Sequence, residues 1–229
     1  MKAKAADPPT APPAPAGSDA ATAQPRRHVI PKAEQARRTR ALIVSTGIRC
    51  LAEHGFSNTT MLLIAREAGI SRGPLHYHFA SRNDLMAAIA EALPLGVDLK
   101  TRKRLNQSKT IEQRLATVVD VALDEHLGPH HFAAMELLLA ARNDPELSAA
   151  IKPHFLESEM AIDDWWIEYL GMLRWPRERL IAFRHVVVAC LRGLALDHLL
   201  QGNAATHSVA MALFREIFIA TARTNADGA

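Results

Sequence analysis

The segment GISRGPLHYHF, residues 69–79, decides how the first part of this chain folds. Gly69 can adopt the positive φ of a tight turn, and Ser71 stands where the N-cap of a helix belongs. Pro74 would then occupy the third helical position, where its missing N–H costs little because first-turn N–H groups have no helical partner. The segment therefore predicts a turn followed by a short helix over 72–78.

A second short helix is predicted over 61–68, directly before this turn. Thr59 and Thr60 precede it and can cap it, while Ile64 and Ala65 share one of its faces. Two short helices joined by a glycine turn form a helix-turn-helix, whose second helix fits the major groove of DNA. A hairpin that serves only packing is the alternative, and the arginine-rich segment before it favours DNA binding.

The polar side chains of the second helix are the predicted DNA contacts. Leu75 and Phe79 lie four residues apart and face the core, so the rings between them point elsewhere. Tyr77 can donate to a phosphate, and the histidines can bind phosphates or base edges. A metal site at His76 and His78 is disfavoured because positions i and i+2 of a helix point apart. The predicted DNA-binding residues are Arg37, Thr60, Ser71, Arg72, Gly73, Pro74, His76, Tyr77, His78 and Arg82.

Charge and cysteine usage narrow the class of protein only slightly. The net charge of +3 over 229 residues is too small to argue for any partner. Between Arg26 and Arg40, however, six arginines and lysines stand against one acid, Glu34. This basic run either neutralises phosphates or forms a solvated surface. Cys50 and Cys190 form no disulfide framework and no CxxC pair, and both are predicted to be buried structural thiols.

The remaining pattern predicts an all-α protein preceded by an irregular arm. Residues 1–30 are rich in proline and alanine and are expected to be disordered. Because no apolar leader and no run of about 20 uncharged apolar residues occurs, a cytoplasmic protein is expected. Ser81 to Asp84 resembles a capping box, and Pro94 should kink the helix that follows. The other predicted helices cover 32–54, 109–127, 130–142, 145–172, 177–201 and 207–223.

A family resemblance is carried by EHGFSNTTMLLIAREAGISRGPLHYHFASRNDL, residues 53–85. Gly-Phe followed by Thr-Thr, then Ala-Gly-Ile-Ser and Leu-x-x-His-Phe, resembles the N-terminal domain of the TetR family of transcriptional regulators over residues 35–93. Two positions depart from the family. It usually has tyrosine where His76 stands and rarely has proline at Pro74, so the operator sequence cannot be borrowed from relatives.

The resemblance implies an N-terminal three-helix helix-turn-helix domain and a larger C-terminal helical domain for effector binding and dimerisation. The implied domains are 31–80 and 81–225. Family members are homodimers in which helices matching 177–201 and 207–223 form a four-helix bundle with their symmetry mates; an ordinary buried helix is the alternative for each. The expected dimer interface is Val187, Leu191, Leu194, Leu213, Phe214 and Ile217.

The larger domain of this family usually holds a small-molecule pocket. The candidate effector residues are Met135, Leu138, Phe155, Met160, Trp165, Trp166, Tyr169 and His185. Asp163 and Asp164 beside the tryptophans would suit a cationic ligand, or else both acids are solvated and one tryptophan packs.

These observations together predict a regulator of transcription. We expect a repressor that binds a near-palindromic double-stranded DNA operator and is released by a small-molecule effector, with an effector-independent DNA-binding factor as the alternative. No Gly-rich phosphate loop, HExxH or nucleophile elbow is present, so an enzyme is not expected, nor is a cofactor or a metal.

Overall fold

The computed structural model describes residues 31–93, 103, 105–107, 110–201 and 204–223, and within them the only regular secondary structure is helical. This agrees with the predicted all-α fold. The predicted disordered arm over 1–30 and the predicted kink at Pro94 lie outside the described residues. The helices are α1 (Lys32–Asn58), α2 (Met61–Glu67), α3 (Arg72–His78), α4 (Arg82–Ala92), α6 (Ile111–His126), α7 (Pro129–Ala141), α8 (Pro145–Leu170), the short 3-10 helix η1 (Gly171–Leu173), α9 (Arg177–Gln201) and α10 (Ala204–Arg223).

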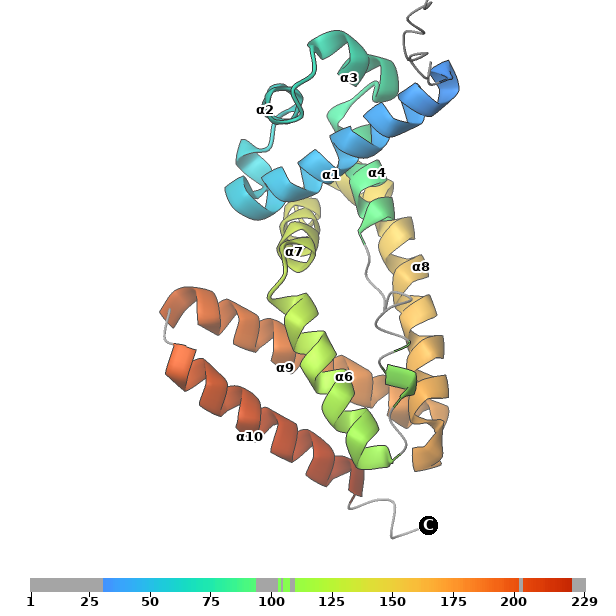
Figure 1. The fold of residues 1–229 in the computed structure, drawn as a ribbon, viewed down its shortest axis with the longest axis vertical. Coiled ribbons are helices and arrows are strands. Elements are labelled where there is room, and N and C mark those ends of the chain that lie inside the picture. The colour runs from blue at the N-terminus through green and yellow to red at the C-terminus, as the bar shows by residue number, and fades with distance from the viewer. Residues whose placement is uncertain (1–30, 94–102, 104, 108–109, 202–203, 224–229) are drawn as a thin grey trace, which may run out of the picture.

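The helices are arranged along one long axis (Figure 1). α1, α2 and α3 lie at one end, where α1 packs on α7. α4 packs along the first part of α8, and α9 and α10 lie against each other towards the opposite end. The helix-turn-helix and the last two helices are therefore at opposite ends of the molecule.

Local sequence signals determine where the early helices begin and end. Gly55, the predicted stop of the first helix, has φ 74° and interrupts the helical backbone there. The last residues of α1, up to Asn58, follow this kink. The predicted capping box is confirmed. The Ser81 hydroxyl accepts the N–H of Asp84 at 3.0 Å, and the Asp84 carboxylate accepts the N–H of Ser81 at 2.9 Å. Asp, one methylene shorter than the usual Glu, still closes the box.

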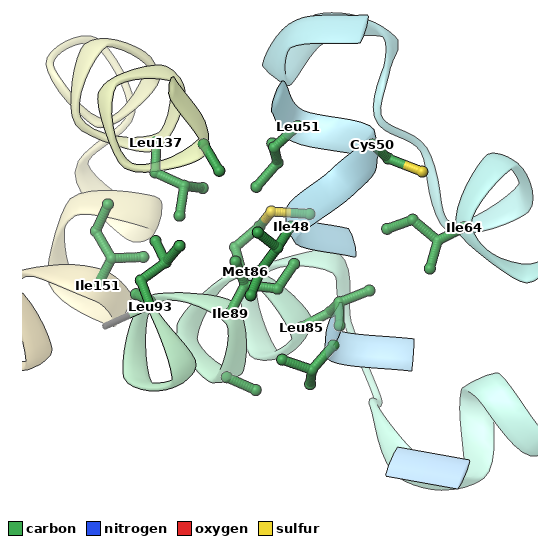
Figure 2. Close-up of a cluster of buried hydrophobic side chains, with 14 of the residues drawn as sticks. Ile48, Cys50, Leu51, Ile64, Leu85, Met86, Ile89, Leu93, Leu137 and Ile151 are labelled. Carbon is green, nitrogen blue, oxygen red and sulfur yellow. The ribbon is translucent and has the colours of Figure 1, made fainter. Parts of the chain in front are cut away.

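The first core is the cluster of buried apolar side chains around α1–α4 (Figure 2). Leu51 on α1 and Leu85 and Ile89 on α4 are fully buried there. So are Leu137 on α7 and Ile151 on α8, which belong to the predicted C-terminal domain. The hydrophobic packing of the helix-turn-helix is thus completed by helices from the second half of the chain.

The second core lies among α6, the end of α8, α9 and α10 and is rich in aromatic rings. Phe183 and Phe218 stack with their ring centroids 4.6 Å apart, and Trp166 packs against both. The prediction for Cys50 is confirmed, since it is buried in the first core and burial raises the pKa of its thiol. The prediction for Cys190 is wrong, because it lies on the exposed side of α9. No helix of the described residues is long and apolar enough to cross a membrane.

Candidate DNA interface and effector region

The outer side of α3 carries the polar rings that the sequence predicted. Leu75 and Phe79 are buried in the first core, which fixes the rotation of the helix. His76 is exposed, and the side chain of Tyr77 is 80% exposed. His78 is half-buried, with its ring meeting the ring of Tyr77 edge to face at a centroid distance of 5.1 Å. The helix therefore presents the rings of His76 and Tyr77 to solvent, and the ring of His78 packs against that of Tyr77.

The turn before α3 has the predicted geometry. Gly69 has φ 65°, and the N–H of Ile70 donates to the carbonyl of Ala65 at 3.0 Å. Ser71 occupies the N-cap position with an extended backbone, but its side chain makes no capping hydrogen bond. A side chain added at Gly73 would meet nothing within 4 Å, so packing inside the protomer does not require glycine there. Ser71, Arg72 and Gly73 are all exposed, so the Ser71 hydroxyl and the backbone at Gly73 are open to solvent.

Two other predicted DNA-binding residues have partners within the protein. The Thr60 hydroxyl accepts the N–H of Leu63 at 3.1 Å and caps α2, as expected. Arg37 and Arg38 on α1 both pair with Glu34, the single acid of the basic run. All three are surface side chains on successive turns, so the pairs are weak and can be exchanged for phosphates.

Arg82 has a structural role that local sequence could not indicate. One terminal N–H donates to the carbonyl of Phe56 at 2.6 Å, and Nε donates to the carbonyl of Thr59 at 3.3 Å. The guanidinium lies 3.9 Å from the centroid of the Phe56 ring. Burial lowers the pKa of Arg82 from its usual value, although the group remains charged. Its predicted phosphate contact would have to use the N–H groups that remain.

The predicted effector residues do not form one cluster. Phe155 belongs to the first core, whereas Trp166 and Tyr169 belong to the second. Trp165 stacks on Tyr169 at 5.0 Å, and the Tyr169 hydroxyl donates to the carbonyl of Arg114 at 3.2 Å. Of the remaining candidates, Met135 is half-buried, and Leu138, Met160 and His185 are exposed.

Two arginines pair with the two acids that were predicted to bind a cation or be solvated. Arg184 on α9 is buried and donates to the carboxylates of Asp163 and Glu159, both at 2.6 Å. Asp164 points outward and pairs with exposed Arg177 at 2.9 Å. The protein itself therefore supplies the cation for both acids. An arginine within the apolar run of α9 was the sequence signal for this network.

Two histidines at the junction of α6 and α7 also escaped prediction. The rings of His126 and His131 lie 4.6 Å apart, and Nδ1 of His126 bonds the carbonyl of Ala122 at 2.6 Å. Burial, then the charges of His126 and Arg192, lowers the pKa of His131 to about 4. Burial likewise lowers the pKa of His126. Both rings are therefore neutral at pH 7, as their packing against each other requires.

The expected dimer residues divide between two faces of the last helices. Val187 and Leu191 are buried in the second core of the same protomer, so the prediction that they contact a partner is wrong. Leu194 and Phe214 are half-buried against that core. Leu213 and Ile217 are exposed, as a dimer face requires, and share that property with Val186, Leu196 and Leu200 on α9. α9 is apolar on both sides, which is why its sequence could not indicate the outer one.

Comparison with known proteins matches both halves of the chain to one family. Residues 43–89 match the family described as bacterial regulatory proteins, tetR family, and residues 108–220 match the tetracyclin repressor-like C-terminal domain. The chain is 25% identical over 170 residues to the HTH-type transcriptional regulator CymR of Pseudomonas putida, an alignment that covers 74% of this chain and 84% of CymR.

Solved structures agree on the fold. The fatty acid degradation regulator FadR of Bacillus halodurans superimposes with a TM-score of 0.61 at 17% identity, covering 79% of this chain and 94% of FadR. NalD of Pseudomonas aeruginosa, the secondary repressor of the MexAB-OprM multidrug efflux pump, gives 0.55 at 18% identity, covering 81% and 96%. At these identities the likeness extends to the fold alone.

Proposed function

The chain belongs to the TetR family of bacterial transcriptional regulators. On that premise we propose that α3 binds a near-palindromic DNA operator, and that a small-molecule effector releases the protein from this operator. Proteins of this family bind DNA, dimerise and bind small molecules, typically as ligand-responsive repressors. NalD is a repressor by its description, which supports the same sign of regulation here. We expect the protein to act in the cytoplasm, where its DNA target lies.

The observation that carries this proposal is the outward face of α3. A tyrosine that is 80% exposed stands on a helix whose opposite side is anchored by Leu75 and Phe79. Its phenol combines an aromatic face with a hydroxyl that can donate to a phosphate or a base edge. With Arg72 and His76 beside it, Tyr77 can contact phosphates and base edges of a major groove.

The exposed apolar side chains of α9 and α10 are the proposed dimer face. They include Val186, Leu196, Leu200, Val209, Leu213 and Ile217. A symmetric pairing of two protomers through this face would place two copies of α3 on one duplex. Half-sites about one helical turn (roughly 34 Å) apart would follow, and the operator would be near-palindromic.

An effector-independent DNA-binding factor remains the second candidate. It is favoured by the packing of Phe155, Trp166 and Tyr169 into the two cores, which leaves these predicted ligand contacts already occupied. A thermal-shift screen separates the two candidates, because a ligand-responsive protein must bind some small molecule and melt at a higher temperature with it.

DNA binding is tested with a duplex selected from a random pool by the wild-type protein. Arg72→Ala and Tyr77→Phe should weaken binding without lowering the melting temperature, because neither side chain enters the first core. Loss of one phosphate contact should also reduce the slope of log K against log salt by roughly one. Glu157→Ala, at an exposed position of α8, is the control. Unchanged affinity and slope in both α3 variants would refute the assignment of α3 as the recognition helix.

The dimer face is tested by placing a charge on it. Leu213→Asp should give monomers in sedimentation and much weaker DNA binding, since an unpaired buried carboxylate costs several kcal/mol. Leu139→Asp, at an exposed leucine of α7, is the matched control and should stay dimeric. A Leu213→Asp protein that remained dimeric would move the interface elsewhere.

A further inference from the structure

The backbone of Phe56, near the end of α1, is bound on both of its polar groups by charged side chains. The N–H of Phe56 donates to Oε2 of Glu136 at 2.7 Å, and its carbonyl accepts from Arg82 at 2.6 Å. Glu136 belongs to α7 and Arg82 to α4, so neither partner comes from the helix-turn-helix itself. Hydrogen bonds to charged groups are about twice as strong as neutral ones, and the backbone of Phe56 makes two.

Phe56 lies in the last residues of α1, directly before the connection to α2. Gly55 precedes it with φ 74°, and the carbonyl of Gly55 accepts the Thr59 hydroxyl at 2.7 Å. Thr59 is fully buried, and its own carbonyl accepts the second bond of Arg82. Thr60, the next residue, caps α2. A displacement of Phe56 would therefore be passed to the N-terminus of α2 through a chain of hydrogen bonds.

The Glu136 side chain fits closely against this connection. A Cβ added at Gly55 would lie 3.3 Å from Oε2 of Glu136, and the positive φ at that position disfavours any other residue as well. α7 extends from this contact towards α6 and the far end of the molecule (Figure 1). Met135, a predicted effector contact, is the neighbouring residue of α7.

We propose that Glu136 is the positioning residue through which α7 sets the orientation of the helix-turn-helix, so that the state of the C-terminal helices reaches α3. This inference rests on the proposed function and adds the path by which DNA binding and the C-terminal helices influence each other. A shift of α7 along its axis moves the carboxylate, and the Phe56 peptide follows because its N–H has this acceptor. Packed elements respond to such small shifts by switching between arrangements.

Reciprocity supplies a test that needs no effector. If α7 influences α3, then DNA bound to α3 must influence α7 by the same free energy. The full-length chain is bound to the duplex that it selects in vitro, and amide hydrogen exchange is followed by mass spectrometry. In the wild-type protein DNA should slow exchange of the peptide covering 129–141 by at least roughly fivefold, the lower end of ordinary coupling.

Glu136→Ala should lose this protection in α7 while DNA still protects α3. Glu136→Gln keeps the length and an acceptor oxygen and should restore most of it, which a loss of bulk stability would not explain. If Glu136→Ala does not fold, Glu136→Asp replaces it with the same expected loss, because its carboxylate is one methylene short of Phe56. Glu157→Ala should behave as wild type.

The outcomes separate this inference from the function on which it rests. Wild-type protein that binds no duplex refutes the proposed function, and the inference with it. Wild-type protein that binds DNA without slowing exchange in α7 overturns the inference alone. Protection of α7 that survives in Glu136→Ala also overturns it, because the coupling would then pass through other contacts.

Discussion

The two hydrophobic cores differ in how completely their polar groups are satisfied. Around the first core, the hydroxyl of buried Thr59 and both polar backbone groups of Phe56 have hydrogen-bond partners. Around the second core, several buried side-chain nitrogens of the described residues have no hydrogen-bond partner. They belong to Arg114, Trp166, Trp175, Arg192, His198 and His207. Within the part of the chain that the structure describes, no such atom lies in the helix-turn-helix.

This difference indicates which region is built to be rigid. An unpaired buried N–H costs about 1–3 kcal/mol, so the second region tolerates a cost that the first avoids. A DNA-reading helix must be held at one orientation, whereas a region that receives ligands or a partner can leave donors for them. The predictions below test this contrast, beginning with the largest effect.

Leu85→Ala and Leu191→Ala compare the packing of the two cores at fully buried leucines. We expect Leu85→Ala to cost about 3–4 kcal/mol of unfolding free energy, near the middle of the range for buried leucine. Leu191→Ala should cost about 2–3 kcal/mol, because a core bordered by unpaired polar nitrogens can admit water or collapse more readily. Urea denaturation measures both, and an equal or reversed order would remove the proposed difference in rigidity.

Arg184, which is buried, and Arg82, which is half-buried, compare cations that bind protein acceptors in the two regions. Arg184→Ala should cost about 2–3 kcal/mol because it leaves Asp163 without its counter-charge and Glu159 with only the longer pair to Arg192, at 3.9 Å. Arg82→Ala leaves only two carbonyls and should cost about 1–2 kcal/mol. Arg177→Ala, which removes the exposed pair with Asp164, should cost less than about 0.5 kcal/mol and is the control. If Arg184→Ala resembled Arg177→Ala, the buried network would contribute nothing to stability.

Sequence could predict the N-terminal half in detail because its signals are local. Gly69, Ser81 and Thr60 each specify backbone geometry within four residues, and the predicted turn and the caps at Ser81 and Thr60 form. The side chain of Ser71, the third predicted cap, makes no capping hydrogen bond. The partners of Arg82 lie 23 and 26 residues away, and no local pattern indicates them. The prediction of which face of α9 is exposed was wrong for another reason. Apolar residues surround that helix, so periodicity gave no outer side, and Val187 was assigned to the wrong one.

Acid should destabilise the second region through His131. Its pKa of about 4 in the folded state lies below the ordinary 6.5, so the unfolded chain takes up the proton first. The stability contributed by the neutral ring is therefore complete above about pH 6.5 and is lost as the pH falls towards 4. After discounting for solvent screening of a half-buried ring, the loss is on the order of 1–2 kcal/mol.

The measurement is urea denaturation at several pH values for wild type and His131→Gln. The variant should show a flatter dependence between pH 6.5 and 4, while His126, whose pKa is lowered in the same direction, retains part of it. Identical pH profiles would mean that His131 is protonated equally in both states.

Thr59→Val and Trp166→Phe should give the smallest changes in the free energy of unfolding. Thr59→Val removes a satisfied hydroxyl at nearly constant volume and should cost about 1 kcal/mol. Trp166→Phe removes an N–H that has no partner, so the gain should offset much of the lost contact area and the net change should stay within about 1 kcal/mol of zero. Thermal melts of the two variants suffice, and a costly Trp166→Phe would indicate that its N–H is bonded in solution.

The sharing of the first core between distant parts of the chain also affects synthesis on the ribosome. Leu85 and Ile89 leave the exit tunnel well before Leu137 and Ile151, which complete their burial. About sixty residues separate α4 from the middle of α8, a delay of roughly 3–12 s at ordinary rates of translation. During that interval the nascent helix-turn-helix exposes apolar surface that chaperones bind. A fragment ending at residue 93 would lack Leu137 and Ile151 and would keep this apolar surface exposed.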